Sequence, residues 1–208
     1  GNPALLHGGP FASIAQGTNS ILATKMGLSL SEYVVTEAGF AADLGAEKFF
    51  DIKCVSAGLR PKAVVVVATV RALRHHGGAK KEELNQPSLV RVEKGLANLG
   101  KHLENMKLFG MKAVVAINHF PGDTEEEINA IKHFCHKYET EAISCTGFTD
   151  GGKGMTDLAQ AVDELIQKDE SDFHPLYQRE CPIEEKIHRI ATKVYGADGV
   201  EYAVKAKS

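Results

Sequence analysis

The sequence predicts an α/β domain in which a mainly parallel sheet is covered by helices on both faces. Strand-like and helix-like segments alternate about five times along the 208 residues, as they do in α/β folds. Hydrophobic residues make up 43% of the chain, enough for the core of one large domain spanning residues 1–208. The strongest strand, residues 64–67, consists of four consecutive valines, a pattern typical of a strand in the middle of a sheet covered on both sides.

Five short apolar segments are expected to form the strands. They are residues 4–6, 33–35, 64–67, 112–117 and 141–145. Extended, β-branched runs such as these lose little by lying in a sheet. The first two are followed by turns that contain glycine, which favours short connections to the next helix.

Helices are expected between the strands, where apolar residues recur every three or four positions. They cover residues 11–26, 41–54, 87–109, 157–167 and 182–194, together with a helix that begins after Thr124. The clearest is 87–109, whose apolar positions are Leu89, Val92, Leu96, Leu99, Leu103 and Met106. Asp123 and Thr124 precede Glu126 and Glu127, which predicts a helix N-cap with a capping-box partner.

Two polar or glycine-rich segments are expected to be loops. Residues 74–87 contain Gly77 and Gly78 followed by a run of charged side chains, and they predict a surface loop over the sheet edge. Residues 147–154 are rich in glycine and are expected to form an irregular loop after the last strand. Glycine is used where the backbone turns with positive φ or approaches a ligand closely, so this second loop is a candidate for binding.

Charge and composition exclude several classes of protein. The formal net charge of −3 gives no electrostatic footprint for nucleic acid or an anionic membrane, so neither is expected as a partner. No apolar run reaches the roughly 18 residues of a membrane span, and no signal peptide opens the chain, so we expect a cytoplasmic location. The four cysteines show no CxxC spacing and are expected to be reduced thiols.

The residues that follow each strand are the candidate ligand contacts, because ligands bind at the carboxyl ends of the strands in an open parallel sheet. Glycines, one arginine, one asparagine and several aromatic residues fall there, which suits a planar ligand together with an anionic one. Arg71 offers a bidentate clamp for an oxyanion. Phe120 and Phe148 offer faces for a flat ring. Glycine-rich turns at helix starts present N–H groups to phosphate.

Simpler interpretations of the same residues stay open. Taken singly, Phe120 and Phe148 are more typical of a core, and Asn118 is expected to cap the next turn. The chain has no GxxxxGK[ST] phosphate loop and no GxSxG nucleophile turn. His133 and His136 lie three residues apart on one helix, but no third ligand accompanies them, so no metal site is expected.

Longer motifs stand out along the chain. They are HGGPFASIAQG at 7–17, VVTEAGFAADLGAEKFF at 34–50, VATVRALRHHGG at 67–78, AINHFPGDTE at 116–125 and KVYGADGVEY at 193–202. Together they resemble the formate–tetrahydrofolate ligase family over essentially all 208 residues. The chain departs from the usual family pattern at Ser13, Gln16 and Ala41, at Arg74, where the family usually has lysine, and at Phe148, where many members have tryptophan.

The resemblance implies an enzyme that joins formate to tetrahydrofolate and gives 10-formyltetrahydrofolate through a formyl phosphate intermediate. Formate, MgATP and tetrahydrofolate would be the substrates, and a monovalent cation belongs to the same expectation. The resemblance also implies a fold similar to the P-loop NTPases and a homotetramer.

The same resemblance assigns roles to individual residues. Phe120 and Phe148 correspond to the two walls of a pterin slot, and Phe40 corresponds to the formyl and folate site. Asn118 matches a position that contacts adenine. The remaining matched residues are Gly151, Gly152 and Gly154 in the glycine loop near the nucleotide, and His7, Gly8, Gly9 and Arg71 in support of the site.

The resemblance also limits what the chain is expected to do alone. The family's phosphate-binding loop lies upstream of the segment that matches Gly1, so we expect the 208-residue chain not to complete the reaction by itself. The alternative hypothesis is a degenerate or truncated module that binds folate or nucleotide without catalysing ligation.

Overall fold

The computed structural model describes residues 18–206, which form two compact units. Among the described residues, unit 1 comprises 18–60 and 174–206, and unit 2 comprises Pro61–Phe173. Each unit has buried apolar side chains of its own, such as Phe50 in unit 1 and Ile117 in unit 2. The expectation of one domain over residues 1–208 stays a prediction.

Unit 2 is an α/β unit with a three-stranded parallel sheet. Its strands are β1 (Val64–Thr69), β2 (Ala113–Asn118) and β3 (Glu141–Cys145), in the order β1-β2-β3. These are three of the five predicted strands, and they confirm the α/β class. The expected strand at residues 4–6 lies outside the described residues.

The strand predicted for the middle of the sheet is wrongly placed. β1 lies at one edge of the described sheet, and β2 is the central strand, with four consecutive buried residues. In β1, Val66 and Ala68 are buried on one face, whereas Val65 and Val67 are 38% and 66% exposed on the other. Four valines in a row have the same pattern whether one face is covered or both, so the sequence does not distinguish the two cases.

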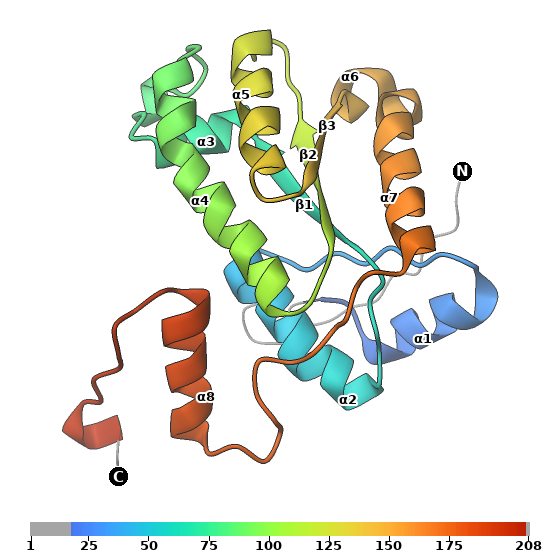
Figure 1. The fold of residues 1–208 in the computed structure, drawn as a ribbon, viewed down its shortest axis with the longest axis vertical. Helices are drawn as coiled ribbons and strands as arrows, with labels where there is room; N and C mark the ends of the chain where they lie inside the picture. The colour runs from blue at the N-terminus through green and yellow to red at the C-terminus, as the bar shows by residue number, and fades with distance from the viewer. Residues whose placement is uncertain (1–17, 207–208) are drawn as a thin grey trace. The chain divides into compact units, whose positions relative to one another are not determined.

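Helices cover both faces of this sheet, as predicted (Figure 1). Helix α7 (Thr156–Lys168) packs on one face of β2 and β3. Its apolar contact consists of Val114, Ala116, Cys145, Leu158 and Ala161. Helices α4 (Leu89–Leu108) and α5 (Glu125–His136) lie on the opposite side. No described helix of unit 2 covers the β1 half of this face, in line with the exposure of Val67.

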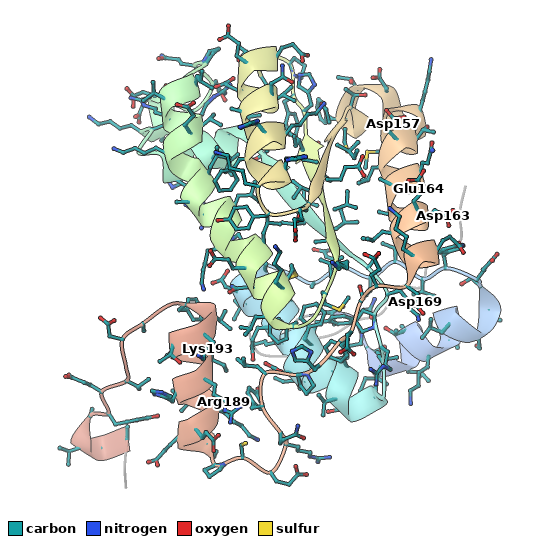
Figure 2. The ribbon with its side chains drawn as sticks, in the orientation of Figure 1. Asp157, Asp163, Glu164, Asp169, Arg189 and Lys193 are labelled. Carbon is teal, nitrogen blue, oxygen red and sulfur yellow. The ribbon has the colours of Figure 1, made fainter. Side chains whose placement is uncertain are left out.

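The helices of unit 2 follow from amphipathic spacing and from capping. Helix α4 buries its apolar positions as the spacing predicts. Thr124 caps α5, and Glu127 completes the capping box. Helix α7 turns Leu158 inward, while Asp157, Asp163 and Glu164 are exposed along it (Figure 2). The remaining short elements of the unit are α3 (Val70–His76), α6 (Gly147–Asp150) and the 3₁₀ turns Lys81–Glu83 and Gly151–Met155.

Two predicted loops of unit 2 contain more helix than expected. The segment 74–87 begins inside α3, because this helix continues to His76, and most of its later residues are exposed around a 3₁₀ turn. The glycine-rich segment 147–154 folds into α6 and the 3₁₀ turn that follows it. Local i→i+3 hydrogen bonding lets glycine-rich segments form such turns without a long helix.

Unit 1 consists of helices joined by extended segments. Its elements are α1 (Ile21–Leu30), the π-helical turns Ala42–Ala46 and Phe49–Cys54, α2 (Val55–Ala57), α8 (Ile183–Arg189), the π-helical turn Ile190–Val194 and the 3₁₀ turn Val204–Ala206. The predicted helices at 41–54 and 182–194 are confirmed. The helix predicted at 11–26 is shifted: it begins at Ile21 and extends four residues past Met26, while residues 11–17 of the prediction lie outside the described residues.

The predicted strand at residues 33–35 is wrong within the described residues, because it pairs with no other strand there. Tyr33 and Val35 are 47% and 95% exposed. Without a ladder partner, and with two of its three side chains exposed, the segment does not form a strand.

A fully buried lysine ties two helical segments of unit 1 together. Lys53 Nζ donates hydrogen bonds to Asn19 O, Asn19 Oδ1 and Thr24 Oγ1 at 2.9, 2.8 and 2.8 Å. Burial lowers the pKa of Lys53. Three acceptors match the three N–H donors of an ammonium group, so the start of α1 is held against residues 49–54.

Candidate functional site

The three strands of unit 2 end level with one another. In the sheet register Thr69 lies opposite Asn118, and Asn118 lies opposite Cys145. The His119 N–H donates to Cys145 O at 2.9 Å, which joins the segments that leave β2 and β3. Residues that follow all three strands therefore meet at one edge of the sheet, where parallel sheets bind ligands.

An aromatic pair stands at this edge. Phe120 follows β2 and Phe148 lies in α6, and their ring centroids are 5.2 Å apart with a 50° angle between the rings. Phe148 is 72% exposed and Phe120 is half-buried, so neither belongs to the core. Two rings that enclose a stacked heterocycle lie about 7 Å apart, twice the aromatic contact distance. The two rings contact each other, so a ligand ring enters between them only when one ring moves.

A small cavity adjoins the aromatic pair. Its volume is about 150 Å³, and it is lined by His119, Phe120, Pro121, Thr146 and Thr149. Sites that enclose a whole drug-sized ligand usually measure about 300–1,000 Å³. This hollow therefore suits one ring or one small group of a larger ligand rather than the whole molecule.

A tight turn holds the Phe120 backbone. The Phe120 N–H donates to Asp123 Oδ2 at 2.9 Å, and the Asp123 N–H donates to Phe120 O at 3.1 Å. Gly122 has φ of 100°, a value that other residues rarely adopt. Asp123 was expected to share the cap of α5, but Thr124 is the cap and Asp123 closes the turn instead.

The structure requires glycine at two of the three glycine positions in the predicted nucleotide loop, but not at the third. Gly151 has φ of 58°, and a Cβ on Gly154 would lie 2.6 Å from the backbone carbon of Thr146. Both positions therefore require glycine for the fold itself. A Cβ on Gly152 would meet nothing within 4 Å, so packing among the described residues does not require glycine at this position.

Arg71 and Asn118 also belong to this edge. Thr69 Oγ1 caps α3 by accepting the Ala72 N–H at 3.1 Å, which places Arg71 in the first turn of the helix with an exposed side chain. Asn118 is half-buried at the last position of β2. Within residues 18–206 its side-chain amide makes no hydrogen bond, so it does not cap the next turn there.

Sequence reasoning missed a buried ion pair beside the turn. Arg74, expected at the start of a surface loop, is 2% exposed and pairs with fully buried Glu127. Burial raises the pKa of Glu127, but hydrogen bonds from Arg74, Ser88 N–H and Thr124 outweigh it and bring the value to about 2. The helical spacing of Val70, Leu73 and Arg74 put them on one face, and this spacing was the available signal.

The other predicted site residues lie elsewhere. Phe40 belongs to unit 1, where it is 71% exposed and has φ of 75°, an uncommon value for an aromatic residue. A Cβ on Gly45 would clash with the Gly39 carbonyl, so the turn at Gly39 and Phe40 packs closely on the helical turn Ala42–Ala46. His7, Gly8 and Gly9 lie outside the described residues.

No three histidine, cysteine, aspartate or glutamate side chains converge as metal ligands in residues 18–206. Over the same residues, no helix has the length and apolar character needed to cross a membrane. The chemistry available at the sheet edge is aromatic stacking, amide hydrogen bonding and the charge of Arg71.

The fold and the site together define an α/β protein with a candidate ligand site at the carboxyl edge of a parallel sheet. The model of the family described as "Formate–tetrahydrofolate ligase" matches residues 1–208, and the chain belongs to this family. It is 53% identical over 201 residues to a formate–tetrahydrofolate ligase from Paracoccus denitrificans (strain Pd 1222), an alignment that covers 97% of this chain. The chain spans 36% of the length of that relative.

Proposed function

We propose that this chain forms the folate-stacking surface and part of the nucleotide-contacting surface of an ATP-dependent formate–tetrahydrofolate ligase. The observation that supports this most directly is the contact between half-buried Phe120 and exposed Phe148 beside a small cavity, in a chain of that family. Exposed apolar surface that is rimmed by polar residues is typical of ligand-binding grooves. The family's folate substrate carries a flat pterin ring that suits such a pair.

Folate binding separates the two rings. Phe120 is anchored because its N–H is bonded to Asp123, whereas Phe148 is 72% exposed on a helix of only four residues. We therefore assign the movement to Phe148, whose ring swings away by roughly 2 Å to admit the pterin. Phe40 is a further aromatic contact to folate that the family resemblance suggests.

The nucleotide contacts come from the same sheet edge. The free amide of Asn118 has the donor and acceptor groups needed to contact adenine. Gly152 leaves open space where a phosphate group approaches the backbone, while Gly151 and Gly154 shape the loop. Arg71 supplies the positive charge suited to an oxyanion.

The proposed reaction has two steps. A formate oxygen attacks the γ-phosphorus of MgATP, ADP leaves, and formyl phosphate is formed. The folate amine then attacks the formyl carbon, phosphate leaves with the electrons of the C–O bond, and the amine nitrogen loses its proton to water. Phosphoryl transfer depends on positioning and charge neutralisation more than on covalent help from the protein. Arg71 would stabilise the negative charge that develops on the transferred groups.

Several wider properties follow from the family resemblance and belong to the same proposal. They are a P-loop-NTPase-like fold for the complete site, a monovalent cation, a homotetramer and a cytoplasmic location. The degenerate-module alternative is not favoured, because 53% identity over 201 residues connects the chain to a ligase.

Calorimetric titration with tetrahydrofolate and, separately, with MgATP tests the proposal. Phe120→Ala and Phe148→Ala are expected to weaken tetrahydrofolate binding by about tenfold each, as expected for loss of one aromatic stack. Phe134→Ala is the matched control, because Phe134 on α5 and Tyr138 in the turn after it form a second aromatic pair at the same 5.2 Å separation. Equal effects of all three substitutions, or no folate binding by the unaltered chain, would contradict the proposed stacking.

A further inference from the structure

A buried guanidinium lies directly behind the turn that carries Phe120. Arg74 Nε donates to Glu127 Oε1 at 2.8 Å, and Arg74 Nη2 donates to Glu127 Oε2 at 2.6 Å. This bidentate pair lies in the interior, with Arg74 2% exposed and Glu127 fully buried. Glu127 also accepts the Ser88 N–H at 2.8 Å and the Thr124 N–H at 3.0 Å. The pair is therefore fixed by α3, by α5 and by the start of α4.

The remaining contacts of Arg74 reach the turn itself. Its Nη2 lies 3.3 Å from Asp123 Oδ1 and 3.5 Å from the carbonyl oxygen of Gly122. Its Nη1 donates to Leu84 O at 3.0 Å. The second oxygen of Asp123 accepts the Phe120 N–H at 2.9 Å. A continuous chain of polar contacts therefore runs from Glu127 through Arg74 and Asp123 to the Phe120 backbone.

We propose that Arg74 is a positioning residue for folate binding, which holds the Phe120 backbone in place through Asp123. This inference rests on the proposed folate site. Arginine suits the task because its planar fork reaches several acceptors at once in a fixed geometry. A lysine has one nitrogen and cannot satisfy both Glu127 oxygens, Asp123 and Leu84 together.

The first test measures the turn without any ligand. The chain contains no tryptophan, so Phe148→Trp introduces a single indole beside the Phe120 ring, whose emission is excited apart from the tyrosines. In this background Arg74→Lys is expected to shift the emission to longer wavelength and to lower its anisotropy, because a loosened Phe120 no longer covers the indole. Arg91→Lys is the matched control, since Arg91 pairs with Glu83 at 3.0 Å without touching residues 119–124.

The second test measures tetrahydrofolate affinity in a double-mutant cycle. Arg74→Lys and Asp123→Asn are each expected to weaken binding by about fivefold, the usual effect of one lost hydrogen bond. The double variant is expected to be no weaker than either single variant, because both interrupt the same connection. Titrations at a temperature well below the unfolding midpoint of every variant exclude loss of folded protein as the cause.

The outcomes separate this inference from the proposed function. Unchanged emission and unchanged affinity for Arg74→Lys, in a chain whose folate binding depends on Phe120, would overturn the positioning role alone. Additive losses in the cycle would overturn the route through Asp123. A chain that binds no folate would overturn the proposed function, while the ligand-free emission would still decide whether Arg74 holds Phe120 in place.

Discussion

Two groups of buried carboxylates, one in each unit, have pKa values displaced in opposite directions although burial acts on them in the same sense. Glu127 in unit 2 is fully buried, and its pKa is about 2. Asp51 in unit 1 is 5% exposed, and burial raises its pKa to about 8. The difference lies in the neighbours. Arg74 faces Glu127, whereas Glu47, another carboxylate, faces Asp51.

The neighbours of Asp51 explain why it stays protonated. Asp51 Oδ1 accepts the Leu176 N–H at 2.6 Å, which favours the charged form but does not outweigh burial and the adjacent Glu47. The pKa of Glu47 is also raised, by burial first, although Lys48 and the Tyr177 hydroxyl favour its ionised form. Two carboxylates that share one buried site do not both ionise readily, so this pair retains a proton. The charge of the neighbouring side chain, rather than the depth of burial, therefore decides whether the pKa of a buried carboxylate is raised or lowered.

The largest effect is expected when the Arg74 guanidinium, the cation that pairs with Glu127, is removed. Arg74→Met leaves Glu127 buried without a counter-ion, and we expect a loss of about 3–5 kcal/mol in the free energy of unfolding. Lys62→Met is the control, because Lys62 pairs with Asp169 at 2.6 Å on the surface, where such a pair contributes less than about 1 kcal/mol. Urea unfolding of both variants checks this, and equal losses would show that burial of the pair is unimportant.

The second prediction concerns pH, and the two units should respond in opposite directions. Glu127 has a lowered pKa, so its contribution is present above pH 4.5 and is lost as the pH falls toward 2. Asp51 has a raised pKa, so its contribution is present below about pH 4 and is lost as the pH rises toward 8. Asp51→Asn keeps a neutral acceptor for the Leu176 N–H. It should abolish the loss of stability between about pH 4 and 8.

Hydrogen exchange measures the two units separately. The Leu176 amide donates to Asp51. In the unaltered chain its protection factor, which corrects for the intrinsic pH dependence of exchange, should fall as the pH rises from 5 to 8. In Asp51→Asn its protection should stay constant over this range. The Ser88 amide, which donates to Glu127, is the internal control and should keep its protection between pH 5 and 8. Parallel loss at both amides would refute separate titration of the two sites.

The contrast also shows which features the sequence could predict. Helix α4 and strand β2 were predicted because their apolar patterns are local, and the aromatic contact was foreseeable because parallel strands end at one edge. The Arg74–Glu127 pair was not, since its members are 53 positions apart and no local pattern connects them. The edge position of β1 in the described sheet was hidden for a similar reason, because its four valines are apolar whatever covers them.

The smallest expected changes in stability come from two glycine substitutions. They distinguish Gly154, which the fold requires, from Gly152, which is open to a ligand. Gly154→Ala forces a Cβ against the Thr146 backbone and should cost about 1–3 kcal/mol of stability. Gly152→Ala meets open space and should change stability by less than about 0.5 kcal/mol. If phosphate approaches the backbone at Gly152, this second variant should nevertheless lose MgATP affinity in calorimetry, because the added methyl group occupies the ligand's space. An unchanged MgATP affinity in Gly152→Ala would instead place the phosphates elsewhere and leave folate stacking as the role of this loop, through Phe148.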